Sequence, residues 1–341
     1  MKNYKLLFIP ILAILFFFSS ALSQKVGSTS MQFLKVMPCA RATAMGDAYS
    51  VIASGADAVF WNPAGLASIE GRQISMTYIQ WILDTKQGAF AFAMPLGSIG
   101  AVGLQLQYID FGDIPEAIWG APYSSDPNYP GLTGNTFRPY SYLAGLTYAK
   151  QITDKFSTGL SVKYAYESLY NGQSVVAVTK TNDTTTVNTW ANGLLFDFGL
   201  HYNTGFRSVE IAAAVQNFGA NIQFAVDPNP APLALRVGIA ANIIGKNALL
   251  MIDDANRLGI AFDLFQPNDF TQQYHLGLEY EYSQMIALRA GYKINYDADG
   301  FTAGVGVHQS FGKMSLTFDY SYGSMNYNLG NVQRISVGVG F

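Results

Sequence analysis

The chain contains few charged residues, a single cysteine and no long apolar run beyond its first segment. Only 13% of its residues are charged, while 50% are hydrophobic. Typical soluble domains carry roughly 25% charged residues. After residue 23 no apolar stretch approaches the ~18 residues that indicate a membrane-spanning helix. The hydrophobic residues are therefore interleaved with polar ones, which excludes a helical membrane protein and favours strands.

Other absences exclude several classes of site and function. Cys39 is the only cysteine, so no intrachain disulfide is available. The 20 Lys and Arg residues are outnumbered by 23 Asp and Glu residues, which leaves no basic footprint for nucleic acid. The sequence also lacks a phosphate-binding glycine loop and a paired Cys-x-x-Cys.

The first residues have the features of a secretory signal peptide. Lys2 and Lys5 precede the apolar run 6–18, and the small residues Ala21 and Ser23 follow it. A stable transmembrane helix needs about 20 apolar residues, so a membrane anchor is the weaker interpretation. We predict that residues 1–23 are removed.

Strict alternation of apolar and polar residues marks many segments of residues 71–341 as β-strands. In the segment 156–167, Leu160, Val162 and Tyr164 alternate with small or charged residues such as Ser161 and Lys163. Successive side chains of a strand point to opposite faces. A soluble sandwich would turn the apolar face inward, whereas a membrane barrel turns it toward lipid and lines the lumen with the polar face.

The pattern recurs and predicts an antiparallel transmembrane β-barrel of about 14 strands over residues 71–341. An even number of strands is typical of bacterial single-chain barrels. The expected strands are 73–82, 86–95, 98–110, 139–151, 154–168, 189–203, 206–217, 232–244, 256–265, 272–283, 285–295, 300–310, 313–323 and 332–341.

Loop lengths and the last strand both support the barrel. The predicted loops alternate between long outer ones and short inner ones, as outer-membrane barrels do, and only the inner loop 245–255 is an exception. Val337, Val339 and Phe341 alternate up to the final residue, which resembles the signal read by the barrel-insertion machinery. We therefore expect the outer membrane of a Gram-negative-type bacterium, with membrane lipid and that machinery as partners.

Residues 24–70 do not alternate. They are rich in small residues, and Asn62 before Pro63 is typical of a helix N-cap followed by proline at the first helical position. Small side chains allow backbone to approach the barrel wall closely, and glycines on the lumen faces provide matching space. We predict a plug or hatch inside the barrel.

This segment resembles the PorV/PorQ family, which is related to the FadL-type long-chain fatty-acid transporters. The resemblance rests on Phe33-Leu34-Lys35-Val36, on 40–48 and on 61–67. It implies a 14-stranded barrel with an N-terminal hatch. The candidate plug residues are Arg41, Met45, Gly46, Asp47, Asp57, Trp61, Asn62, Pro63 and Gly65. They either hold the plug in place or contact a passenger.

The resemblance implies two functions. The first is docking or shuttling in type IX protein secretion, with secretion proteins or substrates that bear C-terminal sorting domains as partners. The alternative is passive transport of hydrophobic small molecules. Charged lumen positions of both signs argue for the first, because an apolar solute needs an apolar track. The longest outer loop offers the apolar contact candidates Ile114, Ile118, Trp119, Tyr123 and Tyr129, which either meet a partner or fold over the barrel mouth.

Catalytic and metal-binding patterns are missing. His201, His275 and His308 fall on polar strand faces without metal-ligand spacing, and nothing couples a serine to a histidine. The segment 295–300 resembles half of a calcium loop, but an Asp-Gly hairpin turn explains it better. We expect no enzyme, no cofactor and no bound metal.

Overall fold

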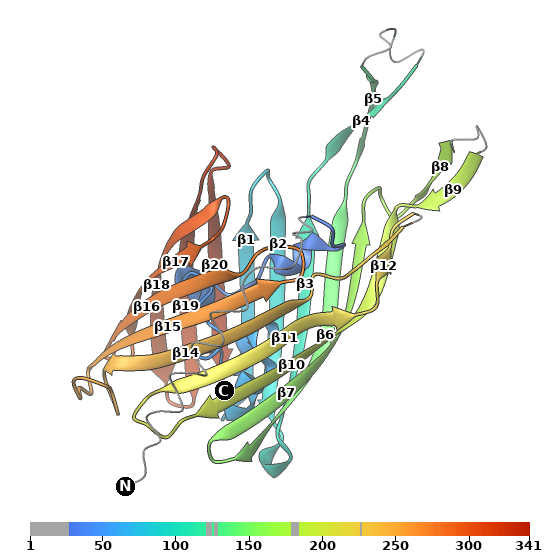
Figure 1. Cartoon of the computed structure of the whole chain (residues 1–341). Coiled ribbons are helices and arrows are strands. Elements are labelled where there is room, and N and C mark those ends of the chain that lie inside the picture. The colour runs from blue at the N-terminus through green and yellow to red at the C-terminus, as the bar shows by residue number, and fades with distance from the viewer. Residues whose placement is uncertain (1–26, 121–124, 126–128, 179–183, 226) are drawn as a thin grey trace.

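A computed structural model describes residues 27–120, 125, 129–178, 184–225 and 227–341. The predicted signal peptide and its cleavage point lie outside the described residues. Fourteen antiparallel strands form a closed barrel (Figure 1). They are β1 (Gln73–Gln80), β2 (Lys86–Pro95), β3 (Ala101–Asp110), β6 (Tyr140–Thr153), β7 (Phe156–Ser168), β10 (Trp190–Asn203), β11 (Glu210–Gly219), β14 (Ala234–Ile244), β15 (Asn256–Pro267), β16 (Gln273–Tyr282), β17 (Ile286–Ile294), β18 (Asp299–Phe311), β19 (Met314–Met325) and β20 (Asn331–Gly340).

The barrel closes between its first and last strands. β1 pairs with β20 from Gln73↔Gly340 to Gln80↔Gln333. Beyond this ladder, Arg72 and Phe341 exchange backbone hydrogen bonds in both directions at 2.9 Å. Closure pairs the two terminal strands with each other, so neither presents a free edge to the bilayer. The predicted fold class and strand number are confirmed.

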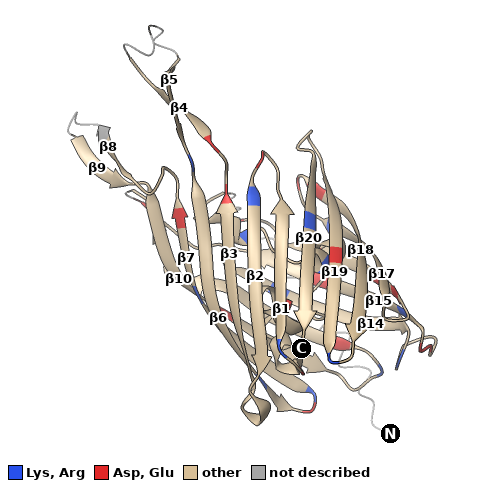
Figure 2. Cartoon of the chain, turned by 180° about the vertical axis from the view of Figure 1, so that it is seen from behind, with Lys and Arg blue, Asp and Glu red and all other residues tan. Residues whose placement is uncertain are grey.

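The two faces of the strands are as predicted. On β7, Leu160 and Tyr164 are exposed on the outside, whereas Ser161 and Lys163 are buried inside. In Figure 2 the charged positions of β2 and β3 lie at the outer ends of these strands, and the ribbons below them carry none. The apolar band below these positions faces lipid. No helix in the described part of the chain is long and apolar enough to span a bilayer.

Three two-stranded ribbons were missed by the sequence analysis, which treated their residues as loop. They are β4–β5 (Ile114–Ile118, Gly131–Phe137), β8–β9 (Ser174–Val178, Thr184–Asn188) and β12–β13 (Ile222–Gln223, Pro228–Asn229). Figure 1 shows the first two projecting from the outer end of the barrel. Neither face of such a ribbon is covered by lipid or by a core. Neither face therefore needs apolar residues, and the alternation that identifies barrel strands is absent.

Two predicted turns differ from the structure. The inner turn expected at 204–205 spans 204–209, because Thr204 and Val209 form a hydrogen-bonded loop before β11 begins. At 295–300 the left-handed residue is Asn295 (φ 66°) rather than the expected Asp-Gly pair. The Asn295 amide donates to Gln272 O across the outer end, which holds this turn.

The wall is irregular at one place. β11 stops at Gly219, paired with Leu195, so β10 residues 190–194 are left without a described partner on that side. Below the gap the β10–β11 register shifts between Phe196 and Phe198, where Asp197 accepts a hydrogen bond from Asn217 N at 2.7 Å. After β11, Ile222 and Gln223 in β12 lie against β10.

The segment before β1 runs through the barrel interior (Figure 1). Its elements are η2 (Gln32–Lys35), α2 (Ala40–Ala44), η3 (Gly55–Asp57), α3 (Ala58–Trp61) and η4 (Pro63–Ser68). α2 contacts β17 to β20, and η4 contacts β3, β6, β7 and β10 on the other side. The interior segment therefore reaches across the lumen from wall to wall.

Candidate functional site

Glycines on the inner faces of the strands accommodate the interior segment. A Cβ added to Gly291 would lie 2.0 Å from Gly46 N, and one added to Gly159 would lie 2.4 Å from the Pro63 carbonyl carbon. At Gly304 the same atom would lie 2.5 Å from Ala44 Cβ. Any side chain at these positions would displace the segment. The backbone of residues 39–68, which we call the plug core, is thus seated directly on the wall.

A buried carboxylate ties the plug core to the wall. Glu279 on β16 receives two hydrogen bonds from Arg41, both at 2.8 Å. It also pairs with Arg289 at 2.6 Å and Arg257 at 2.5 Å, and Arg289 reaches Asp319 at 2.6 Å. The Glu279 and Arg289 side chains are at most 1% exposed, so the centre of this network is desolvated.

Asp47 provides a second tie. Its carboxylate lies 2.7 Å from Lys293 on β17. Burial alone would raise the pKa of Asp47, but Lys293, with smaller effects of His275 and Arg334, holds it below its ordinary value. Asp47 follows Gly46, and both residues adopt positive φ. Glycine tolerates that conformation freely, which explains its place at the turn after α2.

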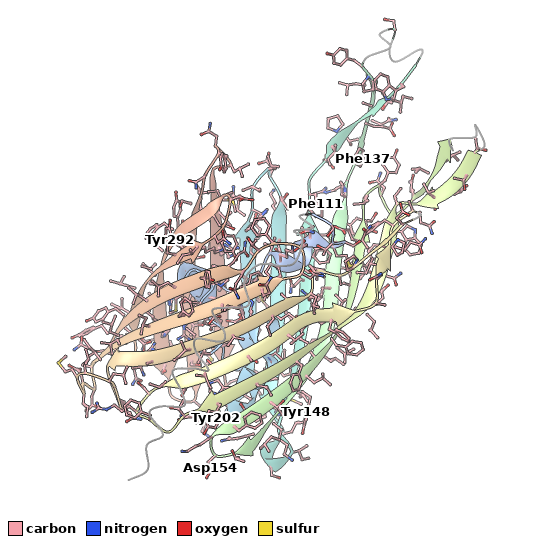
Figure 3. The ribbon with its side chains drawn as sticks, viewed as in Figure 1. Phe111, Phe137, Tyr148, Asp154, Tyr202 and Tyr292 are labelled. Atoms are coloured by element: carbon pink, nitrogen blue, oxygen red, sulfur yellow. The ribbon has the colours of Figure 1, made fainter. Side chains whose placement is uncertain are left out.

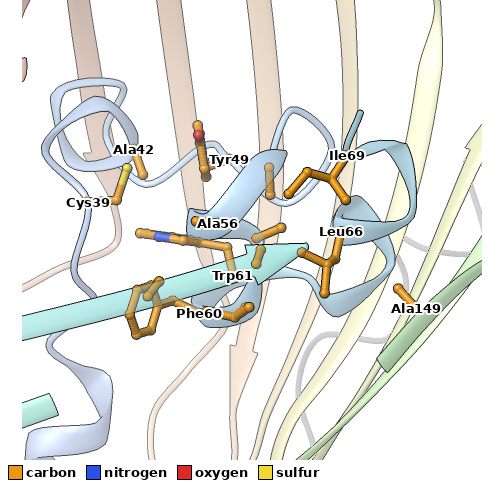
Figure 4. Close-up of a cluster of buried hydrophobic side chains, with 14 of the residues drawn as sticks. Cys39, Ala42, Tyr49, Ala56, Phe60, Trp61, Leu66, Ile69 and Ala149 are labelled. Atoms are coloured by element: carbon orange, nitrogen blue, oxygen red, sulfur yellow. The ribbon is translucent and has the colours of Figure 1, made fainter. Parts of the chain in front are cut away.

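Trp61, in the buried cluster of Figure 4, and the two residues after it, Asn62 and Pro63, organise the other half of the plug core. Asn62 Oδ1 accepts a hydrogen bond from Ala64 N at 3.1 Å, which confirms the predicted N-cap, with Pro63 at the first position of η4. Asn62 Nδ2 donates to Ser50 O at 2.9 Å. Trp61 is fully buried and donates from Nε1 to Pro38 O at 2.9 Å.

The remaining candidate plug residues also face the interior. A Cβ on Gly277 would lie 2.6 Å from Met45 O, and one on Gly65 would lie 1.9 Å from Ala53 O. Burial raises the pKa of Asp57, and hydrogen bonds from Ser75 and Cys39 offset the rise only in part. Arg41 and residues 45–47 therefore lie against β16 and β17. Pro63 and Gly65 in η4 lie near β3, β6, β7 and β10, whereas Trp61 contacts β11 and β14.

Wall residues that the sequence analysis did not select hold the plug core as well. Asp263 accepts hydrogen bonds from Tyr49 N and Ser50 N at 3.1 and 2.8 Å. Arg236 lies over the Trp61 ring at 5.0 Å and over Phe265 at 4.2 Å. Arg236 on β14 and Asp263 on β15 both occupy inward positions in strands whose apolar and polar residues alternate. That alternation was the signal that could have identified them.

An apolar cluster occupies the outer end of the lumen. Met31, Phe33 and Leu34 on and beside η2 are at most 6% exposed. They pack against wall and loop residues Ile109, Leu143, Ala165, Ala191, Leu195, Ile222 and Ala231, with Phe111 and Phe224 partly buried at its edge. This cluster could not be predicted from alternation along the sequence, because its members come from separate strands and loops.

One aspartate holds the strip that covers this cluster. We call residues 28–37 the outer strip. Asp269, in the loop between β15 and β16, accepts hydrogen bonds from Thr29 at 2.6 Å, Gln32 at 3.1 Å and Lys35 at 2.6 Å. Burial alone would raise the pKa of Asp269, but these donors hold it below its ordinary value.

The inner end of the lumen is polar. Three adjoining cavities of about 400, 360 and 200 Å³ surround the inner side of the plug core. We call them together the inner vestibule. They are lined by charged and polar groups that include Arg41, Glu210, Asp254, Arg257 and Thr317. The plug core thus separates an apolar outer region from a polar inner one.

The outer-loop candidates lie on the first ribbon. Ile114 and Ile118 are on β4, and Trp119 and Tyr129 follow, with exposures between 39% and 69%. Tyr123 lies outside the described residues. The ribbon projects away from the barrel mouth instead of folding over it (Figures 1 and 3). At its base Phe137 packs on Tyr170 with ring centres 5.0 Å apart.

The histidines do not come together. His275 is fully buried, and its ring hydrogen-bonds with the Tyr296 hydroxyl at 2.7 Å. His201 lies 3.2 Å from Glu210, and His308 lies 3.7 Å from Asp319. Within the described part of the chain, no group of His, Cys, Asp and Glu could hold a metal ion.

Comparison with known proteins identifies the family. Residues 22–336 match the model of the outer membrane protein transport protein family (OMPP1/FadL/TodX). The chain belongs to this family. No curated protein matches it. Membership agrees with the expected outer-membrane location and with a transport protein rather than an enzyme class.

Solved structures of this family share the fold. The Pseudomonas putida toluene transporter TodX superposes with a TM-score of 0.57 at 14% identity, covering 88% of this chain and 96% of its own. The Ralstonia pickettii toluene transporter TbuX gives 0.51 at 15%, with 88% and 96% covered. The CymD monoaromatic hydrocarbon channel gives 0.52 at 13%, with 89% and 97% covered.

The FadL-type relation that the sequence suggested is therefore supported, and the closer PorV/PorQ relation is not. The residues that carried the resemblance, such as Arg41 and Asn62, are interior contacts of the plug core. Their contacts account for their presence in an OMPP1/FadL/TodX barrel without any secreted partner.

Proposed function

We propose that the protein is a passive transporter of hydrophobic small molecules across the outer membrane. The observation that carries this proposal is the apolar cluster of Met31, Phe33 and Leu34 at the outer end of the lumen. Burial of apolar surface drives binding of an apolar solute. Toluene and monoaromatic hydrocarbons, named for TodX, TbuX and CymD, are the solute class to test first.

The charged lumen does not oppose this function. From the sequence alone, these charges favour a plugged scaffold over a transporter, because an apolar solute needs an apolar track. In the structure Glu279, Arg289 and Asp319 pair with one another and with the plug core. These charged residues hold the plug core against the wall. The apolar surface that a hydrophobic solute requires lies elsewhere, beside the outer strip.

The gap in the wall lies next to this cluster. Leu195 ends the β10–β11 ladder, and Ile222 in the loop beyond it packs on the same apolar residues. Strand pairing is incomplete there, so fewer backbone hydrogen bonds need to open for a solute to reach the cluster. This supports access at the outer end, between β10 and the loop 220–233.

Uptake of labelled toluene by cells that carry or lack the gene tests the proposal. We expect deletion to slow uptake and Leu195→Asp to lower it by roughly tenfold or more, since a buried carboxylate disfavours an apolar solute by over 1.4 kcal/mol. Ile118→Asp, on the projecting ribbon, is the matched control and should leave uptake unchanged. Equal uptake with and without the gene would refute the proposal.

Docking in type IX secretion stays a second candidate, supported by the exposed apolar ribbon. Trp119 and Tyr129 are 62% and 69% exposed, beyond the barrel rim. A protein partner would bury such side chains. In a host whose secreted proteins bear sorting domains, Trp119→Ser should then impair their surface delivery. Normal delivery in the deletion strain would exclude this role.

A further inference from the structure

The loop 245–255 between β14 and β15 is an outlier at the inner end of the barrel. It is longer than the other inner turns, which are 96–100, 154–155, 204–209, 283–285 and 312–313. In Figure 1 it lies at the lower left, beyond the ends of its two strands. Transport through the lumen does not explain its length.

Its tip is apolar and open to the surroundings. Leu250, Met251 and Ile252 are 80%, 51% and 75% exposed. Three consecutive exposed apolar side chains are costly in water, because their surface is not removed from it. We call these residues the apolar tip.

The loop is built to hold the apolar tip in this position. Leu250 N and Met251 N both donate to Ile243 O, at 3.2 and 3.3 Å. Arg207, from the neighbouring inner turn, donates to Ala248 O at 2.6 Å and to Leu249 O at 3.0 Å. Ala248 is fully buried beneath the tip. The exposure is therefore imposed by a braced backbone.

The opposite side of the loop is polar. Lys246, Asp253 and Asp254 line the inner vestibule, whereas the three residues of the apolar tip do not. Asp253 folds back to accept hydrogen bonds from Ala255 N and Asn256 N at 2.8 and 2.7 Å. The loop thus turns its charges toward the lumen and its apolar side chains away from it.

The apolar tip continues the lipid-facing surface of the wall. Ile243, the residue that accepts its hydrogen bonds, follows the outward residue Ile239 on β14. The flanking inner turns expose Phe206 (65%) and Met285 (46%). Arg207, beside Phe206, adds a cation at this rim, where phospholipid phosphates lie.

We propose that the apolar tip inserts into the inner, phospholipid leaflet of the outer membrane and anchors the β14–β15 side of the barrel there. The occupant is lipid because the tip is continuous with the wall surface that lipid already covers. An amphipathic element with this division of faces lies in the interface with its apolar side in the acyl region.

Fluorophores on single introduced cysteines test this placement. Leu250→Cys and, as the matched control on the polar side of the same loop, Asp254→Cys are labelled in the full-length protein. Cys39 is 1% exposed and stays unlabelled in the folded chain. The proteins are placed in vesicles of phosphatidylethanolamine and phosphatidylglycerol, some with brominated acyl chains.

We expect bromine to quench the label at 250 several-fold more strongly than the label at 254, and aqueous iodide to show the reverse order. Equal quenching at the two positions would overturn the proposal. The proposal would also be overturned if the label at 250 became protected from iodide only after a periplasmic protein extract was added. That result would identify a protein partner instead of lipid.

A label-free variant provides a second measurement. The double change Leu250→Ser and Ile252→Ser removes the apolar tip but no hydrogen bond of the loop backbone. It should lower the melting temperature in phospholipid vesicles relative to Asp254→Ser. Identical melting temperatures of the two variants would contradict a lipid anchor.

Discussion

The plug core and the outer strip belong to the same interior segment but are held in different ways. The plug core is seated on glycines and fastened by the desolvated network around Glu279. The outer strip rests on apolar side chains and on one loop residue, Asp269. Its cation, Lys35, is 30% exposed, whereas Arg289 in the plug-core network is fully buried.

This difference indicates which part of the interior segment we expect to move. Breaking a network in which one buried carboxylate holds three arginines leaves several charges without partners, which is strongly unfavourable. A single pair with a partly exposed cation is more readily replaced by water. Apolar contacts are non-directional and can be exchanged for a solute of similar chemistry. We therefore expect the plug core to stay fixed in the lumen and the outer strip to act as an exchangeable cover over the apolar cluster.

The largest effect is expected from Glu279→Ala. It would leave Arg41, Arg289 and Arg257 without their shared partner and cost about 3–5 kcal/mol. Denaturant unfolding of the reconstituted barrel measures this loss. Glu281→Ala removes only one partner of Arg257 and serves as the control, with a much smaller loss. Similar losses for both variants would show that the plug core is not fastened at Glu279.

Gly291→Ala tests the seating of the plug core and ranks second. The added methyl group meets Gly46 N at 2.0 Å, and such overpacking typically costs about 1–3 kcal/mol. Gly88→Ala places the same group where nothing lies within 4 Å. We expect higher single-channel conductance for the first variant alone. A tight, equally stable Gly291→Ala barrel would mean that the wall yields without displacing the plug core.

Asp269→Asn should have the smallest and most local effect, roughly 1 kcal/mol for a single pair whose cation is partly exposed. Hydrogen exchange at Leu34 and Val36 in the outer strip should speed up, while amides of the plug core stay protected. Lys35→Met should act in the same way. Faster exchange throughout the interior segment would erase the distinction between the two regions.

The same contact predicts a pH dependence. The pKa of Asp269 is below its ordinary value in the folded protein. Its stabilising contribution is therefore complete above the ordinary pKa of about 3.9 and is lost as the pH falls through the lower, folded value. Exchange in the outer strip should accelerate over that acidic range in the wild type, and Asp269→Asn should abolish the acceleration.

Much of the wall could be predicted from the sequence, whereas the ribbons could not. β7 was expected at 154–168 and found at Phe156–Ser168, because lipid on one side and lumen on the other impose strict alternation. β4 and β5 have no buried face to impose a pattern. Asn62 was correctly expected as a cap because capping depends on neighbours in the chain.

The partners of the interior residues required the tertiary structure. Arg41 was a candidate from its motif, but nothing local indicates that it meets Glu279, which lies 238 positions further along the chain. The same holds for Asp269 and the outer strip. The apolar cluster arises only when β3, β6, β7 and β10 curve around Phe33.

By itself the sequence determined a 14-stranded outer-membrane barrel preceded by a segment of small residues, because periodicity and composition act over short distances along the chain. Only the tertiary structure decided that the lumen charges bind the interior segment, that an apolar cluster lies at the outer end, and that the inner loop 245–255 exposes Leu250. Each of these depends on which strands face one another across the closed barrel, and alternation along one strand carries no information about the strand opposite.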